Sequence, residues 1–545
     1  MFIKKTRSKN FTYLSIVETY RDNGRVRHKT IVKLGRLDLL QKNGSLARLG
    51  ESFQNLTPQF RIPKIKELAR LNWGAELIYR RIWKNFDLDT ILDQSFTNSK
   101  IEFDYKETVF LEIISRLMRP CSKLQVYLNQ RQFHGINEIP LQHIYRVLDY
   151  LSDFQKSIED MIFEKHVQKF GMEINVVLYD VTTLYFEGAV PDKLRDYGFS
   201  KDAKFGEVQV VVGMLVDLYG RPISCGIFPG NTFESKTLEA ALESVRTRFQ
   251  IKQVVIVADR GINSKLNLKQ IKDHSHDYVV GCRLKSLSKN IQKKALDLNS
   301  YETFHEKDGT ILKYLEMEYD NVIKIEKDGK KTTEILKEKI ACTWSSKRAE
   351  KDRKDRERLI LKAQKLLDNG VPLESKKGAK RYLKAKTEQK GTKDLALDSE
   401  KIKEDAKWDG FYAVQVSKKE MVREDILNAY HSLWKIEESF RIMKHSLEIR
   451  PIYLSTPERV IGHIVLCFLA FVLHRNLELE LMKEGLEHSV ERIRDAINGL
   501  EASILEVGGI KCAVHSPIDG LAKEILRILK VRVPKEAELC SSFEM

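Results

Sequence analysis

The stretch that decides the fold is INVVLYDVT, residues 174–182, an apolar run that carries an aspartate near its end. Four similar runs follow it, and a helical pattern around residues 234–249 separates the third of the five runs from the fourth. Runs that are apolar on both faces are typical of buried central strands. The later runs are VQVVVGMLVDL (208–218), PISCGIFP (222–229), QVVIVAD (253–259) and YVVGC (278–282).

The order of these elements, three strands, a helix, a strand, a helix and a strand, predicts an α/β domain. A mixed sheet with helices on its faces is what the ribonuclease H-like architecture requires, although the pattern alone leaves other α/β folds open. We place the first part of this core at residues 171–282.

Two different patterns precede the core. Residues 11–20 and 25–34 alternate apolar and polar side chains around Asp22-Asn23-Gly24, a strong hairpin signal, so residues 1–58 are predicted to be a small basic β-hairpin unit. Apolar residues then recur with a helical period, for example at Phe110, Ile113 and Leu117. Residues 59–170 are therefore predicted to be a helical domain.

The chain after the core is polar and rich in lysine up to residue 425. Between Lys376 and Lys393 there are eight basic residues and one acidic residue, so we interpret 283–425 as a basic insertion. A helical pattern resumes at 426–480 and would complete the core, and 481–545 is a C-terminal tail region of mixed character.

Composition limits the class of protein. The 545 residues have ordinary globular usage, with 42% hydrophobic and 31% charged residues, and carry 93 Lys and Arg against 77 Asp and Glu, a net charge of +16. This balance favours a polyanionic partner, and mere solubility is the alternative. The seven cysteines have no metal-binding spacing and are expected to be reduced. The longest apolar run, Ile461 to Leu473, is too short to span a bilayer, so we expect a cytoplasmic protein without a membrane partner.

Two aspartates are the first candidates for chemistry. Asp180 and Asp259 each follow an apolar run and are expected where their strands end, at the edge of the sheet where α/β proteins place their sites. Each alone is better explained as a turn residue, because Asp is common in turns. Together they are more informative, because two adjacent carboxylates repel each other unless a cation neutralises them. The pair suggests a divalent-metal site.

The third candidate is the segment AYHSLWKIEESFRIMKHSLEIRP. On one continuous helix Tyr430, Glu437 and Lys444 are spaced by seven residues and share a face, with Arg441 close to it. Glu438 points about 100° away, so we assign the functional carboxylate to Glu437. A solvated face with ordinary ion pairs is the alternative.

Taken in order, these motifs resemble the DDE transposases of bacterial insertion sequences, in the group whose helix motif is Y-x2-R-x3-E-x6-K and whose members carry a long insertion before the catalytic Glu. The motif's Arg falls on Leu433, and Lys435 or Arg441 are its candidate replacements. The segments that carry the resemblance are VVLYDVTTLYFE, GFSKD (198–202), FPGNTFESKT (228–237), VVIVADRGI, KRAEKDRKDRERLI (347–360), WDGFY (408–412) and YHSLWKIEESFRIMK.

The resemblance implies metal-dependent DNA cleavage at element ends, followed by attack of the released 3′-hydroxyl on target DNA. Asp180, Asp259 and Glu437 would be the catalytic residues and would hold two Mg²⁺ ions, for which Mn²⁺ would substitute. A nuclease of the same fold without joining activity, and a domesticated DNA-binding protein, remain alternatives.

The resemblance also implies double-stranded DNA as the partner and a homodimer in the DNA complex. Tyr430, Arg441 and Lys444 are the candidates for phosphate contacts beside the catalytic Glu. The insertion would add affinity through its cations, for which we single out Lys376, Lys377, Lys380 and Arg381.

Overall fold

The computed structural model describes most of the chain, and the chain divides into two compact units. The first unit contains residues 1–70, 502–515 and 535–545, and the second contains 71–501 and 516–534. The described residues are 1–22, 25–56, 65–97, 99–170, 175–201, 204, 206–305, 308–327, 330–369, 377–385 and 395–540.

The first unit opens with the predicted hairpin. Strands β2 (Phe11–Asp22) and β3 (Arg25–Arg36) pair antiparallel, with Asp22 opposite Arg25, and β1 (Phe2–Ser8) adds a third strand. Asn23 and Gly24, the predicted turn, lie outside the described residues. Helices α1 (Leu37–Lys42) and α2 (Ser45–Leu56) follow.

A second small sheet in this unit has the order β18-β17-β16-β4 and joins segments that are distant in sequence. Its members, in that order, are Ala537–Leu539, Ile510–His515, Glu501–Val507 and Ile65–Asn72.

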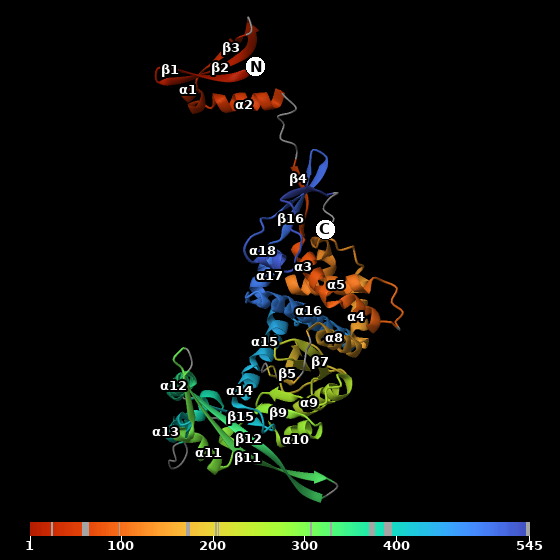
Figure 1. The fold of residues 1–545 in the computed structure, drawn as a ribbon, viewed down its shortest axis with the longest axis vertical. Helices are drawn as coiled ribbons and strands as arrows, with labels where there is room; N and C mark the ends of the chain where they lie inside the picture. Colours follow the sequence, from red (N-terminus) through yellow and green to blue (C-terminus); the bar gives the residue numbers. More distant parts are fainter. Residues whose placement is uncertain are drawn as a thin grey trace. The chain divides into compact units, whose positions relative to one another are not determined.

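The second unit is built around a nine-stranded mixed sheet of order β10-β11-β12-β15-β9-β8-β5-β6-β7 (Figure 1). The five strands expected from the apolar runs form its second half. Strands β5, β6 and β7 are antiparallel neighbours, whereas β8 runs parallel to β5 and β9 parallel to β8. These strands are β5 (Val176–Phe186), β6 (Val208–Val216), β7 (Pro222–Pro229), β8 (Val255–Ala258) and β9 (Asp277–Gly281).

Strand β5 is longer than expected. The sequence analysis places Asp180 at the end of its strand, but the strand continues to Phe186 and Asp180 lies opposite Met214 on β6. Residues 181–186 are mainly β-branched and aromatic, which suits a paired strand. Only the pairing of β5 with β8 stops near Asp180, after Leu178.

The other half of the sheet comes from the lysine-rich region 283–425. Strand β15 (Phe411–Val416) pairs antiparallel with β9, and β12 (Lys330–Ser345) pairs with β15. Strands β11 (Ile311–Lys327) and β10 (Glu302–His305) complete it. This region therefore extends the core sheet through antiparallel pairing.

Helices cover both faces of the five-strand half. On one face α9 (Glu234–Glu243) and α10 (Lys265–Asp273) pack on a core that includes Val177, Tyr179 and Ile256. On the other face α14 (Arg423–His431) contacts β8 and β9, and α15 (Trp434–Arg441) contacts β5 and β6 (Figure 1). A five-residue π-helix, Ile442–Ser446, continues α15.

The helical part of this unit surrounds α16 (Pro457–Lys483), which contacts α3, α5 and α7. Gly462 makes the closest approach, because a Cβ there would lie 1.9 Å from the Leu148 carbonyl oxygen. Among the described residues α16 alone is long and apolar enough to cross a membrane, and 94% of its most apolar window is buried. The surrounding helices are α3 (Gly74–Phe86), α4 (Leu88–Ser95), α5 (Tyr105–Met118), α6 (Lys123–Asn129), α7 (Leu141–Asp153) and α8 (Gln155–Phe170).

The remaining elements lie in the lysine-rich region and near the C-terminus. All seven cysteines are free, as expected. The elements are α11 (Lys289–Leu296), α12 (Ser346–Asp368), β13 (Leu383–Ala385), β14 (Leu395–Leu397), α13 (Ser399–Ala406), α17 (Val490–Asn498) and α18 (Gly520–Ile528).

Candidate active site

Asp180 and Asp259 lie on the same face of the sheet. Side chains alternate along a strand, and the neighbours Val177, Tyr179 and Ala258 all point into the core under α9 and α10. Asp180 and Asp259 therefore face the opposite side, where α14 and α15 pack. The carboxylates are directed toward the helices that carry Tyr430 and Glu437.

Asp180 is a largely buried acid, and nearby groups only partly offset the cost of burying its negative charge. Its side chain is 21% exposed, and its Oδ1 accepts a hydrogen bond from the Val181 N–H at 2.7 Å. Burial raises the pKa of Asp180 to about 6; Lys201 and the Val181 N–H oppose the shift, while the charge of Asp259 adds to it. A cation beside Asp180 would stabilise its charged form.

Lys201 supplies part of that positive charge. Its Nζ lies 3.4 Å from Asp180 Oδ1 and 3.3 Å from Glu234 Oε1, and it donates to the Val181 carbonyl oxygen at 2.5 Å. Burial by itself lowers the pKa of Lys201, but the surrounding carboxylates, Asp180, Glu234 and Asp259, raise it above its usual value. The ammonium group is therefore held among three acids.

Glu234 adds a fourth acid to the site, beyond the three expected. A Cβ on Gly261 would lie 2.9 Å from Asp259 Oδ1 and 3.2 Å from Glu234 Oε2, so the two carboxylates flank Gly261. Asp259 is exposed and accepts a hydrogen bond from the Gly261 N–H at 2.7 Å. The sequence analysis missed Lys201 and Glu234, although both lie in segments that carry the family resemblance.

The segment with Glu437 is not one continuous helix. A turn at Ser432 and Leu433 separates α14 from α15, and the π-helix changes the period again before Lys444. The Ser432 hydroxyl donates to the Asn428 carbonyl oxygen at 2.8 Å, a contact that bends helices. The even seven-residue spacing of Tyr430, Glu437 and Lys444 therefore does not describe one straight face.

The two neighbouring glutamates have different surroundings. Glu438 is 22% exposed and accepts a hydrogen bond from Arg475, a guanidinium that is 4% exposed, at 3.2 Å. Glu437 is exposed, and no ion pair to it occurs within the described part of the chain. Glu438 is thus engaged in packing, whereas Glu437 is free to bind a ligand.

The Tyr430 hydroxyl is close enough to Asp259 and Glu437 for the charges of both to affect its pKa. Burial raises the pKa of its hydroxyl to about 12; Arg260 opposes the shift, whereas the negative charges of Asp259 and Glu437 add to it. Its ring packs against that of Tyr412, with centroids 5.0 Å apart. The charges of Asp259 and Glu437 therefore both reach the same hydroxyl.

The expected cations lie at different places. Arg441 is 68% exposed, 3.5 Å from Glu438. Lys444 lines a separate cavity beside Tyr185 and Phe186, several residues along β5 from Asp180. Lys435 and Arg441 are the two candidates to replace the missing motif Arg. Lys435 donates to the Leu218 carbonyl oxygen, whereas the guanidinium of Arg441 is exposed.

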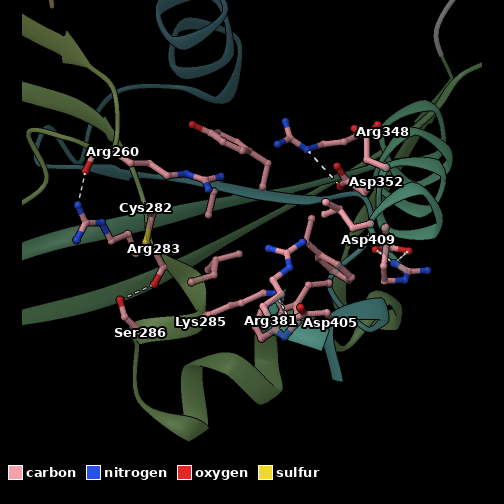
Figure 2. Close-up of a pocket in the computed structure, with 18 of the residues that line it drawn as sticks. Arg260, Cys282, Arg283, Lys285, Ser286, Arg348, Asp352, Arg381, Asp405 and Asp409 are labelled. Atoms are coloured by element: carbon pink, nitrogen blue, oxygen red, sulfur yellow. Dashed lines mark hydrogen bonds and ion pairs between the residues drawn. The ribbon is translucent and has the colours of Figure 1, made fainter. Parts of the chain in front are cut away.

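A cavity of about 650 Å³ adjoins this site, between the ends of β9 and β15 and helix α12. Arg260, the residue after Asp259, lines it, and Figure 2 shows Arg260 and Arg283 on one wall and Arg348 with Asp352 on another. Arg260 and Arg348 both lie over the Tyr412 ring, with Cζ 4.9 and 4.7 Å from its centroid. The cavity is rich in guanidinium groups.

Of the four cations singled out in the insertion, Arg381 lines this cavity. Lys377 is exposed just before the 3₁₀-helix Gly378–Tyr382, which carries Lys380 and Arg381. Lys376 lies outside the described residues.

Two family models match parts of the chain. Residues 171–473 match the family model described as the transposase DDE domain, which covers more than half of the chain, and the chain belongs to this family. Residues 3–59 match the N-terminal domain of IS1634 family transposases. The protein is therefore a transposase, an enzyme of the polynucleotidyl transferase class that acts on DNA.

The chain is also similar to solved structures. The piggyBac transposase synaptic complex with hairpin DNA, determined by cryo-EM, is similar over 78% of each chain, with 9% sequence identity and a TM-score of 0.37. No curated protein matches the sequence.

DDE transposase domains generally use divalent metal ions, and the donor set here suits them. Asp180, Asp259 and Glu437 offer only carboxylate oxygens, which are the ligands that hard cations prefer. Within the described ranges no three acidic, histidine or cysteine side chains stand close enough to form a ready-made metal cage. The acids therefore fit a metal ion chemically.

Proposed function

We propose that the protein cleaves DNA strands at the ends of an insertion sequence and joins the released 3′-hydroxyl to target DNA. Both steps would use one site formed by Asp180, Asp259 and Glu437. The observation that carries this proposal is the placement of Asp180 and Asp259 on one face of two parallel strands, under the helices that bear Tyr430 and Glu437. No covalent intermediate with the protein is needed.

The fold proposed for this chemistry is a ribonuclease H-like core made of β5 to β9. Three antiparallel strands followed by two parallel strands on the other side of β5, with helices between the later strands, support it. The basic region 283–425 would be an insertion that extends this core.

The proposed metal is Mg²⁺, with two ions in the site and Mn²⁺ as a substitute. Asp180, Asp259 and Glu437 would hold the ions, which would supply charge neutralisation at the phosphate and activation of an oxygen nucleophile. Lys201 would balance part of the negative charge of Asp180 and Glu234, since its ammonium group lies within 4 Å of both carboxylates.

Several parts of the chain are proposed to hold DNA. Tyr430, Arg441 and the guanidinium-rich cavity at Arg260 would position phosphates near the site, and Lys444 would do so further along β5. The cations of the insertion and the basic N-terminal sheet would add affinity. We further propose that the protein acts as a homodimer on DNA, in the bacterial cytoplasm.

A cleavage and joining assay tests the proposal. Labelled element ends are incubated with Mg²⁺ and a target plasmid, and wild-type protein is compared with Asp180→Asn and Asp259→Asn. Wild-type protein should release 3′-hydroxyl ends and join them to the plasmid, whereas both variants should bind DNA without cleaving it. Cleavage without joined product would instead identify a nuclease, and DNA binding without cleavage by the wild type would identify a domesticated binding protein.

A further inference from the structure

We propose that a second cavity, on the reverse face of the catalytic sheet, binds a small neutral aromatic molecule. The cavity has a volume of about 550 Å³ and lies among α8, α9, the π-helix Ser244–Arg248 and strands β5, β6 and β7. This volume is in the range of sites for small molecules, about 300–1,000 Å³. It is separate from the guanidinium-rich cavity at Arg260.

Glycines and aromatic rings shape the floor of the cavity. Gly213 and Gly226 stand directly opposite each other on β6 and β7. A Cβ on Gly213 would lie 3.0 Å from the Tyr179 hydroxyl, and one on Gly226 would lie 2.7 Å from the Phe228 ring, so the two rings lie over the two glycines. Ala241 on α9 also lines the cavity and leaves it open because its side chain is small.

The buried hydroxyl of Tyr179 in this cavity could hydrogen-bond to a ligand. Tyr179 is 1% exposed, and its hydroxyl makes no well-aligned hydrogen bond among the residues described, with the Thr237 side chain as its polar neighbour. The Thr237 hydroxyl itself donates to the Glu234 carbonyl oxygen at 2.8 Å. A buried hydroxyl without a well-aligned partner is unfavourable, and a ligand oxygen would satisfy it.

The charges in the wall are already paired. Glu159 accepts hydrogen bonds from the Cys225 N–H at 3.1 Å and from Arg248 at 3.1 Å, and Arg248 also lies 2.8 Å from Asp160. Glu243 adds a further acid and Lys156 a base, so the acids exceed the bases by one. A phosphate or a nucleic acid is therefore disfavoured here, and a neutral ligand fits.

The position of the cavity links it to catalysis. Tyr179 directly precedes Asp180 on β5, so a ligand against Tyr179 contacts the strand that carries the proposed metal ligand, from its other side. The ligand and Mg²⁺ should then change each other's affinity by the same factor. This coupling depends on the proposed function of Asp180, whereas the ligand site itself does not.

Calorimetric titration of the full-length protein with 2-naphthol, a neutral aromatic probe with one hydroxyl, tests the site. Ala241→Trp fills the cavity and should weaken binding at least tenfold, and Tyr179→Phe should weaken it several-fold. Glu239→Trp, on the exposed side of the same helix, should bind as the wild type does. Ala240→Trp, at the exposed rim, is the second blocking variant if Ala241→Trp fails to fold.

The ligand site and its coupling to Asp180 are tested by different outcomes of these titrations. Absence of binding to the wild type, or equal binding to the wild type and the folded blocking variant, would overturn the site. A repeat titration with Mg²⁺ should change the 2-naphthol affinity at least threefold, and an unchanged value would overturn the coupling to Asp180. Failure of the wild type to bind Mg²⁺ would contradict the proposed function instead and leave the ligand site intact.

Discussion

Asp180 and Asp259 each lie two residues beyond the last paired residues of two neighbouring parallel strands, Leu178 on β5 and Val257 on β8. The register pairs Val176 with Val255, an offset of 79 residues (255 − 176), and the two aspartates have the same offset (259 − 180). Parallel strands lie about 4.8 Å apart, so residues at one level are direct neighbours. Continued at the same offset, the register brings Asp259 beside Asp180, and the negative charge of Asp259 adds to the raised pKa of Asp180.

The first prediction separates Glu437 from Glu438. Glu437→Gln should abolish release of the 3′-hydroxyl in Mg²⁺, because the exposed carboxylate is the proposed metal ligand. Glu438→Gln should retain cleavage, because its carboxylate pairs with Arg475 away from the aspartates. The assay is cleavage of a labelled element end, with DNA binding as the control. A dead Glu438→Gln with an active Glu437→Gln would reverse the assignment, and with it the roles of Tyr430 and Lys444.

The second prediction concerns Lys201. Lys201→Met leaves Asp180, Glu234 and Asp259 without their shared cation, so the metal-free variant should unfold at a lower temperature than the wild type. Added Mg²⁺ should then raise the melting temperature more in the variant than in the wild type. Lys236→Met, at an exposed lysine of α9, is the matched control. Equal Mg²⁺-dependent shifts in all three proteins would argue against a cation site around Lys201.

The third prediction concerns DNA affinity from the insertion. Neutralising Lys376, Lys377, Lys380 and Arg381 should flatten the plot of log K against log salt concentration by up to about 0.9 for each DNA phosphate that these cations neutralise in the wild type. A matched set on α12, Arg353, Lys354 and Arg358, already lies within 4 Å of acidic side chains, so its removal should change the slope less. An unchanged slope in the first set would mean that its charges only add solubility.

The fourth prediction tests the helix packing around α16. Gly462→Ala should destabilise the second unit by about 1–3 kcal/mol, because the new methyl group would overlap the Leu148 carbonyl. Gly499→Ala is the control, since its Cβ would lie 3.6 Å from the nearest atoms, an ordinary contact. Thermal unfolding of the full-length protein measures both, and an unchanged midpoint for Gly462→Ala would show that α16 and α7 are not packed so closely.

Part of the fold follows from local sequence patterns. The five apolar runs predict strands β5 to β9 in the observed order, because buried strands need continuous apolar side chains. The extension of the sheet by β10, β11, β12 and β15 does not follow, because β11 and β12 carry many Lys and Glu residues and suggest a solvated charged region. The packing of α16 among helices of residues 74–153 depends on long-range contacts, which no local pattern contains.

The residues of the candidate site are also only partly predictable from the sequence. Asp180, Asp259 and Glu437 can be selected from the sequence by their placement after apolar runs and by helical spacing. Lys201 and Glu234 cannot, because one lies outside regular structure and the other at the first position of α9, where local patterns carry little information. The break between α14 and α15 was also not predicted, because it depends on one hydroxyl, that of Ser432.

Iron-mediated cleavage of the chain tests whether Asp180, Asp259 and Glu437 surround the same metal ions. Fe²⁺ replaces Mg²⁺ in the DNA-bound protein, and ascorbate with peroxide then generates radicals that cut the backbone next to the bound metal. Cuts are expected near all three residues, and they should be suppressed by excess Mg²⁺ and absent in Asp180→Asn. Cuts near Asp180 and Asp259 without a cut near Glu437, or cuts insensitive to Mg²⁺, would contradict it.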